Sequence, residues 1–313
     1  MKPLISRLKL YLRWIILGAT FFFLGKVLKD NWQQVAAIRV EVRGWMWLAI
    51  ALGTTLLAHV CAGWVWSLIL QAFKQSITPI WAIQTYLKTN IAKYLPGNVW
   101  HFYGRIAAAT RVGIALEIAT VSVLLEPLLM VASALLVALL CSHQIAARFG
   151  LGGLLAQWLG LLLVLAALHP RVLNPIVQWL SKLKQQGNAG DSPSPPAQLL
   201  SYPLVPFEGE VGFLMLRSMG FLFTFWAISP IEPGQIPLLV SVFSLSWLLG
   251  LVVPGAPGGL GVFEATAIAL LGKTISPGIL LSVVALYRLI SVLAEAIGAG
   301  LAWLDEQRIR AQQ

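Results

Sequence analysis

The stretch Gly44–Phe73, "GWMWLAIALGTTLLAHVCAGWVWSLILQAF", contains no Asp, Glu, Lys or Arg. A helix needs roughly 20 mostly apolar residues to cross the hydrocarbon core of a bilayer, which is about 30 Å thick. This stretch is therefore long enough to span a membrane. The whole chain of 313 residues is 58% hydrophobic and 11% charged, far outside the range of soluble domains. The sequence predicts an all-α, polytopic integral membrane protein.

Other apolar runs extend this prediction to about seven or eight spans. Two of them, about 213–228 and 279–304, are interrupted by isolated charges at Arg217, Arg288 and Glu295. The first run, about 14–28, follows a basic N-terminus and has no convincing small-residue cleavage site, which favours an uncleaved span over a signal peptide. Three further runs without charged residues lie at 127–147, 149–170 and 233–263.

The net charge of +10 is concentrated at the start of the chain, where the first hundred residues hold eleven Lys or Arg against Asp30 and Glu41. Because cytoplasmic segments of membrane proteins are enriched in Lys and Arg, we expect a cytoplasmic N-terminus and a multi-pass protein of the inner (plasma) membrane. The same rule explains the basic charge without a nucleic-acid partner. Cys61 and Cys141 lie in or beside apolar runs, so neither a disulfide framework nor a metal site is predicted, and no cofactor.

A polar, proline-rich stretch divides the chain. Residues 187–210, "GNAGDSPSPPAQLLSYPLVPFEGE", are expected to form a linker that cannot span the membrane. The preceding stretch 174–186, "NPIVQWLSKLKQQ", has the pattern of a short interfacial helix in the cytoplasm. We expect a single membrane domain over 1–313, with a first half at about 45–170, the loop and interfacial helix at 171–210, and a second half at about 211–304.

The two halves form a weak internal repeat, because the same features follow in the same order: a span, a Pro-Gly break, a charged residue, a short segment, and a span with the opposite charge. Chance resemblance is the alternative to a true internal repeat. Broken backbone is tolerated at membrane depth only inside protein or beside a cavity, so paired breaks point to a transporter-like site with two re-entrant segments. The breaks are Pro96–Gly97 and Pro254–Gly255, followed by Arg105 and Glu126 in the first half and by Glu264 and Arg288 in the second.

Charged residues inside these apolar stretches each cost about 2.5 to 3.5 kcal/mol at the centre of a span, so they are usually paired or face water. We expect Arg105 to pair with Glu126 and Arg288 with Glu264 when no ligand is bound; purely structural ion pairs are the alternative. A helix starting near Gly261 would leave N–H groups suited to a lipid phosphate, although a tight turn between packed helices explains the same glycines. His101 lies four residues before Arg105 and would share its helix face.

Three segments resemble the lysylphosphatidylglycerol synthase transmembrane-region family, the flippase half of the multiple peptide resistance factor, which also occurs as stand-alone membrane proteins. They are "KYLPGNVWHFYGR" (93–105), "APGGLGVFEA" (256–265) and "ALYRLISVLAEAIGAGLAWL" (285–304). The resemblance covers about residues 74 to 304 and implies a membrane region that moves a modified lipid between leaflets. The residues on family motif positions are Pro96, Gly97, Arg105, Pro257, Gly258, Gly259, Gly261, Glu264 and Arg288.

The chain also departs from this family. Glu126 is followed by Pro127 where the family often has Arg, and Phe263 stands where Arg is frequent, so the same lipid cannot be assumed. Only "DEQRIRAQQ" follows Leu304, so we expect no aminoacyl-transfer activity and no enzyme.

These features together predict a lipid flippase for an anionic or glycosylated headgroup. A non-catalytic partner of an envelope biosynthetic enzyme is the first alternative, and a membrane-embedded enzyme acting on lipid-linked substrates is the second. The expected partners are membrane lipids, with an envelope enzyme or a second copy of the chain as further candidates. The candidate headgroup-binding residues are Lys93, Pro96, Gly97, His101, Arg105, Glu126, Pro254, Gly255, Gly258, Gly259, Gly261, Glu264 and Arg288.

Overall fold

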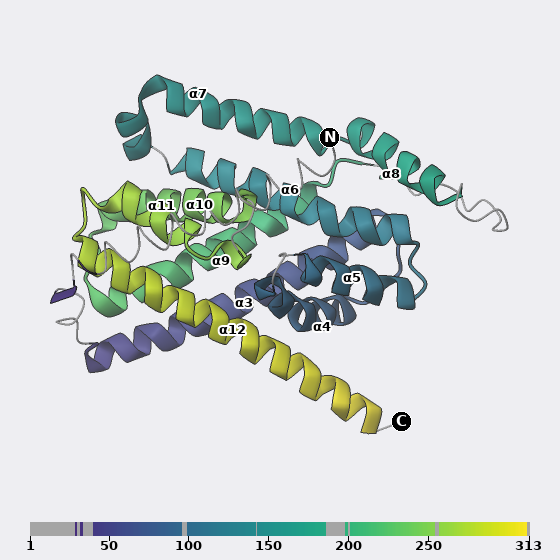
Figure 1. Cartoon of the computed structure of the whole chain (residues 1–313), viewed down its shortest axis with the longest axis horizontal. Helices are drawn as coiled ribbons and strands as arrows, with labels where there is room; N and C mark the ends of the chain where they lie inside the picture. The colour runs from purple at the N-terminus through teal and green to yellow at the C-terminus, as the bar shows by residue number, and fades with distance from the viewer. Residues whose placement is uncertain are drawn as a thin grey trace.

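A computed structural model describes residues 29, 32–33, 40–95, 99–141, 143–185, 198–199, 201–253 and 257–311. These ranges are almost entirely helical and contain no β-strand, which confirms the predicted all-α class (Figure 1). The predicted first span at 14–28 lies outside the described residues. So do the four break residues Pro96, Gly97, Pro254 and Gly255.

Six helices of the described residues are long and apolar enough to cross a membrane. The protein is therefore a multi-pass membrane protein. The outer helix α7 bends at Gly150, whose φ of 65° is in the left-handed region that glycine adopts without strain, and its apolar window runs over Gly150–Ala167. The six helices are α3 (Val42–Ala72), α6 (Leu116–Leu140), α7 (His143–Ala167), α9 (Leu204–Ile228), α10 (Ile236–Val252, with the preceding turn η2, Pro233–Gln235) and α12 (Pro277–Ala311).

Each predicted break is flanked by short elements. The first lies between η1 (Ile91–Tyr94), which continues α4 (Pro79–Asn90), and α5 (Trp100–Arg111). The second lies between α10 and η3 (Pro257–Gly259), which leads into α11 (Val262–Leu271). At 1.5 Å per residue, α5 and α11 are about 18 Å and 15 Å long, too short to cross the hydrocarbon core. Each predicted break is thus followed by a helix too short to span the membrane, and the re-entrant course of the two segments stays a prediction.

The long helices form one bundle, and the short helices α5 and α11 pack against α6 and α10 respectively (Figure 1). Helix α3 packs against α9, α4 and α12, while α10 packs against α6 and α11. Four aromatic rings, Phe221, Phe243, Phe263 and Tyr287, join α9, α10, α11 and α12, with ring centroids 5.4 to 6.3 Å apart. This aromatic cluster fixes α11 against three long helices, although α11 itself is too short to be held by its own hydrogen bonds.

One sequence prediction is wrong. The expected linker 187–210 ends earlier, because α9 begins at Leu204. Pro206 is the third residue of α9, where the backbone N–H has no intrahelical partner in any helix, and a proline therefore costs no hydrogen bond. The correction matters for function because it places Glu210 inside the bundle, fully buried.

The stretch before the linker is helical, as predicted, over α8 (Pro170–Gln185), and Figure 1 shows α7 and α8 along one side of the bundle. Its interfacial position stays a prediction. Helix α7 exposes apolar side chains such as Leu151, Trp158 and Leu162 over most of its length. In a multi-pass membrane protein, such a surface is suited to contact with lipid chains.

Candidate functional site

The flanks of the two breaks contact each other. Elements η1 and η3 touch, and Gly258 has a φ of 58°. A Cβ atom at Gly258 would come within 2.8 Å of the Tyr94 ring, and one at Gly259 within 3.2 Å of the Gly250 backbone. Glycine is therefore required at both positions for the segments to approach this closely.

A cavity of about 380 Å³ opens beside this contact. Its polar wall contains residues from both broken segments together with residues of α9 and α12: Lys93, His101, Arg217, Gly258, Gly259, Arg288, Ser291 and Glu295. Its apolar wall includes Phe102, Leu128, Trp247 and Phe263. A smaller hollow of about 90 Å³ shares Lys93, His101 and Arg217 with it and extends to Arg105 and Glu126. Apart from the four residues outside the described ranges, most of the predicted site residues thus converge on these two hollows.

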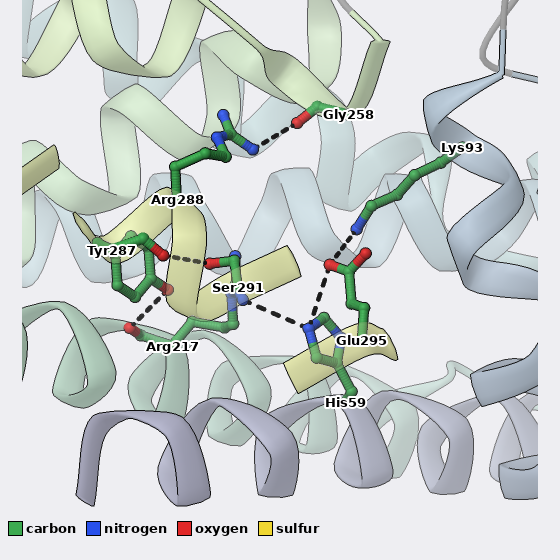
Figure 2. Close-up of polar contacts among 8 residues, drawn as sticks. All are labelled: His59, Lys93, Arg217, Gly258, Tyr287, Arg288, Ser291 and Glu295. Atoms are coloured by element: carbon green, nitrogen blue, oxygen red, sulfur yellow. Dashed lines mark hydrogen bonds and ion pairs between the residues drawn. The ribbon is translucent and has the colours of Figure 1, made fainter. Parts of the chain in front are cut away.

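The second break is held by an ion pair and by its own backbone. Arg288 Nε donates to Glu264 Oε1 at 2.7 Å, as predicted, while its two terminal nitrogens donate to the carbonyls of Gly258 (2.9 Å, Figure 2) and Gly259 (3.2 Å). The other oxygen of Glu264 accepts from the Gly261 N–H at 2.6 Å, at the start of α11. The predicted helix start near Gly261 is confirmed, and the N–H at this start already bonds a carboxylate from the chain itself.

The first broken segment also carries the expected ion pair. Arg105 of α5 donates to Glu126 of α6, and both side chains are almost completely buried. The guanidinium lies 4.6 Å from the centre of the Tyr86 ring and 5.6 Å from that of Phe102, both favourable cation–π positions. Glu126 is followed by Pro127, which lines both hollows and removes one backbone donor from α6.

A third cluster joins the first break to α12 and α3 (Figure 2). Lys93 Nζ donates to Glu295 Oε1 at 2.6 Å, and His59 Nε2 lies 3.3 Å from the same oxygen. Arg217 extends the cluster, with a terminal nitrogen 3.4 Å from His59 Nε2. Arg288, Ser291 and Glu295 share the inward face of α12, as their spacing predicts, since all three line the cavity.

Sequence reasoning recognised Arg217 and Glu295 as intramembrane charges but left them out of the site. The seven-residue spacing from Arg288 was the available signal for Glu295, because it places both on one helix face. His59, a histidine within the apolar run 44–73, was also left out of the site, yet its Nε2 lies within 3.4 Å of both Glu295 and Arg217. Glu210 was missed because it was assigned to the linker.

Arg217 differs from the other cavity cations. Within the described residues no carboxylate pairs with it, and its Nε has no hydrogen-bond partner although the side chain is buried. It is positioned by Tyr287, whose O–H donates to the Arg217 carbonyl at 3.1 Å and whose ring lies 5.3 Å from the guanidinium carbon (Figure 2). A buried cation without a counter-charge is costly, so it needs an anion or water.

These features define a class: a multi-pass helical membrane protein with a charged interior cavity between two broken segments. A profile of the protein family described as "Lysylphosphatidylglycerol synthase TM region" matches residues 10–298, so the chain belongs to that family. The resemblance is thereby confirmed, and it extends further toward the N-terminus than the quoted motifs. A comparison with curated proteins finds no match. Family membership places the protein among membrane proteins that handle lipids.

Proposed function

We propose that this protein is a lipid flippase that moves an anionic or glycosylated lipid across the cytoplasmic membrane, without aminoacyl transfer. The observation that carries the proposal is the charged cavity between the two broken segments. Broken helices of this kind bind polar substrates near the bilayer midplane in many transporters. The predicted cytoplasmic N-terminus and plasma-membrane location belong to the same proposal.

The charges of the cavity favour an anionic headgroup. Lys93, Arg217 and Arg288 line it against one carboxylate, Glu295. Lys93 is paired with Glu295, and Arg288 is paired with Glu264, which does not line the cavity. One positive charge, that of Arg217, therefore remains without a paired carboxylate. Guanidinium groups form strong charge-assisted hydrogen bonds with phosphate oxygens, so the headgroup phosphate would take the open side of Arg217.

Lys93 and His101 would complete the headgroup site. Lys93 shares its Nζ with Glu295, and an arriving phosphate competes for the same donors. Exchange of the Glu295 contact for a headgroup contact would give the site an empty and a loaded state. His101 Nδ1 is buried without a hydrogen-bond partner in the described residues, so it is free to contact a ligand's hydroxyl or phosphate group.

One observation favours the alternative in which the protein is a non-catalytic partner of an envelope biosynthetic enzyme or of a second copy. Each of the three guanidinium nitrogens of Arg288 already donates a hydrogen bond within the second broken segment, as expected for a structural ion pair. In that reading the ion pairs stabilise the helices and the cavity carries no substrate. Arg217 separates the two readings, because it has no such partners.

The decisive experiment is lipid movement in proteoliposomes that contain the full chain. Fluorescent phosphatidylglycerol, a fluorescent glycolipid without phosphate, and a neutral diacylglycerol would be compared for wild type, Arg217→Gln, and the exposed control Arg111→Gln. We expect the wild type to move at least one headgroup class, Arg217→Gln to be about tenfold or more slower, in line with the loss of a charge-assisted hydrogen bond, and the control to match the wild type.

Two results together would refute the proposal: a wild type that moves no lipid, and an Arg217→Gln variant that fully complements a deletion strain. Product formation from a lipid-linked substrate would favour a membrane-embedded enzyme. Restored activity of a co-purified envelope enzyme, with no lipid movement, would favour the partner reading.

A further inference from the structure

Helix α9 carries an unpaired acid as well as an unpaired cation. Glu210 lies seven residues before Arg217, two turns away on the same helix face. Three ion pairs, Arg105–Glu126, Arg288–Glu264 and Lys93–Glu295, account for the other cations and acids of the two hollows. Arg217 faces the cavity, whereas Glu210 lines neither hollow and is fully buried.

Neither oxygen of the Glu210 carboxyl has a hydrogen-bond partner among the described residues. The charges that act on it are those of Glu126 on α6 and Arg105 on α5, and its own charge acts on Tyr86 of α4 and Cys61 of α3. Helix α10 has no ionisable residue, and the charged residues of α12 in the bundle, Arg288 and Glu295, lie at the cavity. Glu210 therefore lies within the electrostatic influence of Arg105, a cation that is already paired with Glu126.

An ionised carboxylate in this position would be buried, unpaired and beside another carboxylate. The desolvation of such a charge is so unfavourable that buried carboxyls in this situation take up a proton instead. With a proton on Glu210, the group formed by Glu210, Glu126 and Arg105 is electrically neutral. We propose that Glu210 is a proton-binding site and that lipid movement through the cavity is coupled to the proton it carries.

The coupling follows from the charges that surround Glu210. In a second state of the bundle that admits water to Glu210, the O–H bond breaks, the proton passes to that water and the electron pair stays on the carboxylate, which then attracts Arg105 and repels Glu126. Arg105 belongs to α5, the short helix that also brings His101 to the cavity wall. Proton binding thus favours the state with an intact Arg105–Glu126 pair, and proton release favours a shift of α5. The two states would differ in their affinity for a headgroup, and by linkage the headgroup would alter proton affinity.

The proton site can be tested without any transport measurement. Infrared spectra of the purified full chain would be recorded for wild type, Glu210→Gln, and Glu208→Gln, a matched control because Glu208 is exposed two residues earlier on the same helix. We expect a C=O stretching band of a protonated carboxyl in wild type and in Glu208→Gln, and its loss in Glu210→Gln. An unchanged band in Glu210→Gln, or no such band in wild type, overturns the proposal.

The coupling rests on the proposed flippase function and has its own readout. In proteoliposomes with an imposed pH gradient, fluorescent phosphatidylglycerol should redistribute in opposite senses when the gradient is reversed. This response should be lost in Glu210→Gln, which keeps gradient-independent exchange, and retained in Glu208→Gln. A Glu210→Gln variant that still follows the gradient contradicts the coupling.

The two proposals can fail separately. A wild type that moves no lipid but loses its carboxyl band in Glu210→Gln refutes the flippase function and leaves the proton site in place. A wild type that moves lipid with no response to the gradient refutes the coupling alone. If Glu210→Gln does not purify in folded form, Glu210→Asp replaces it. A shorter acid in the same place should shift the band frequency, and an unshifted band overturns the assignment.

Discussion

The two broken segments are built from the same parts with the charges exchanged. In the first, the cation Arg105 is on the short helix and the acid Glu126 is on the following span; in the second, Glu264 is on the short helix and Arg288 on the span. The side chains of the first pair are 3% and 2% exposed, whereas those of Arg288 and Glu264 are 19% and 10% exposed. The first pair borders only the smaller hollow, whereas Arg288 of the second pair lines the larger cavity.

This difference indicates a division of roles. Arg105 contacts aromatic rings around its guanidinium, so the first pair fixes helix α5 against α6 and α4. Arg288 instead bonds the carbonyls of the second break, so the second pair fixes the backbone that borders the cavity. We therefore expect loss of the first pair to affect stability most, and loss of the second to affect lipid handling most.

The largest effect on stability is expected for Glu126→Gln. This change leaves the guanidinium of Arg105 buried without a counter-charge, which typically costs about 3 to 5 kcal/mol. Thermal unfolding in detergent would show a strongly lowered midpoint. The double variant Arg105→Met/Glu126→Leu should recover most of the loss, because it removes the buried charge entirely. A double variant as unstable as Glu126→Gln would mean that the pair itself, and not the isolated cation, determines stability.

A smaller loss of stability is expected for Glu264→Gln, about 1 to 3 kcal/mol, as for the loss of one partner of a buried polar contact. The amide oxygen can still accept from the Gly261 N–H, and Arg288 keeps its two carbonyl partners. The free Arg288 charge should nevertheless alter headgroup selectivity in the proteoliposome assay. Equal destabilisation by Glu264→Gln and Glu126→Gln would contradict the proposal that the first pair mainly stabilises the fold and the second mainly acts in lipid handling.

Much of this comparison could be predicted from sequence. The long apolar runs predict helices because backbone groups in hydrocarbon must bond within their own segment. The pairs Arg105–Glu126 and Arg288–Glu264 were predictable because charges isolated in apolar sequence need partners, and each pair lies within one broken segment and its following span. The helix start at Gly261 followed from the glycines and prolines before it.

The rest depends on tertiary packing. Lys93 and Glu295 lie more than two hundred positions apart, so no local pattern connects them. Glu210 was assigned to a linker because prolines precede it, although Pro206 is tolerated in the first turn of α9. That no carboxylate of the described residues pairs with Arg217 could not be foreseen either, since it depends on all the side chains that surround it.

A substitution at the contact between the two breaks should have a moderate effect. Gly258→Ala places a side chain at a φ of 58° and against the Tyr94 ring. The left-handed backbone alone costs about 1 to 2 kcal/mol, and the contact adds to it. Gly53→Ala is the control, because Gly53 lies within α3 and an added Cβ there meets no atom within 4 Å. It should be neutral or slightly stabilising in thermal unfolding. A Gly258→Ala variant as stable as the wild type would show that the two breaks do not need this close approach.

The smallest effect on stability is expected for the ion pair Lys88–Glu306 at the rim of the bundle. This pair serves as the exposed reference for the two buried pairs. Lys88 of α4 donates to Glu306 of α12 at 2.7 Å, but both side chains are about one-third exposed, at 31% and 32%. Water and salt screen such a pair, so Lys88→Gln should cost only about 0.5 kcal/mol and its effect should vanish at high salt. Thermal unfolding at low and high ionic strength measures both. If Lys88→Gln lost as much stability as Glu126→Gln, the most exposed pair would contribute as much as the most buried one. Burial would then not determine how much each of the three ion pairs stabilises the protein.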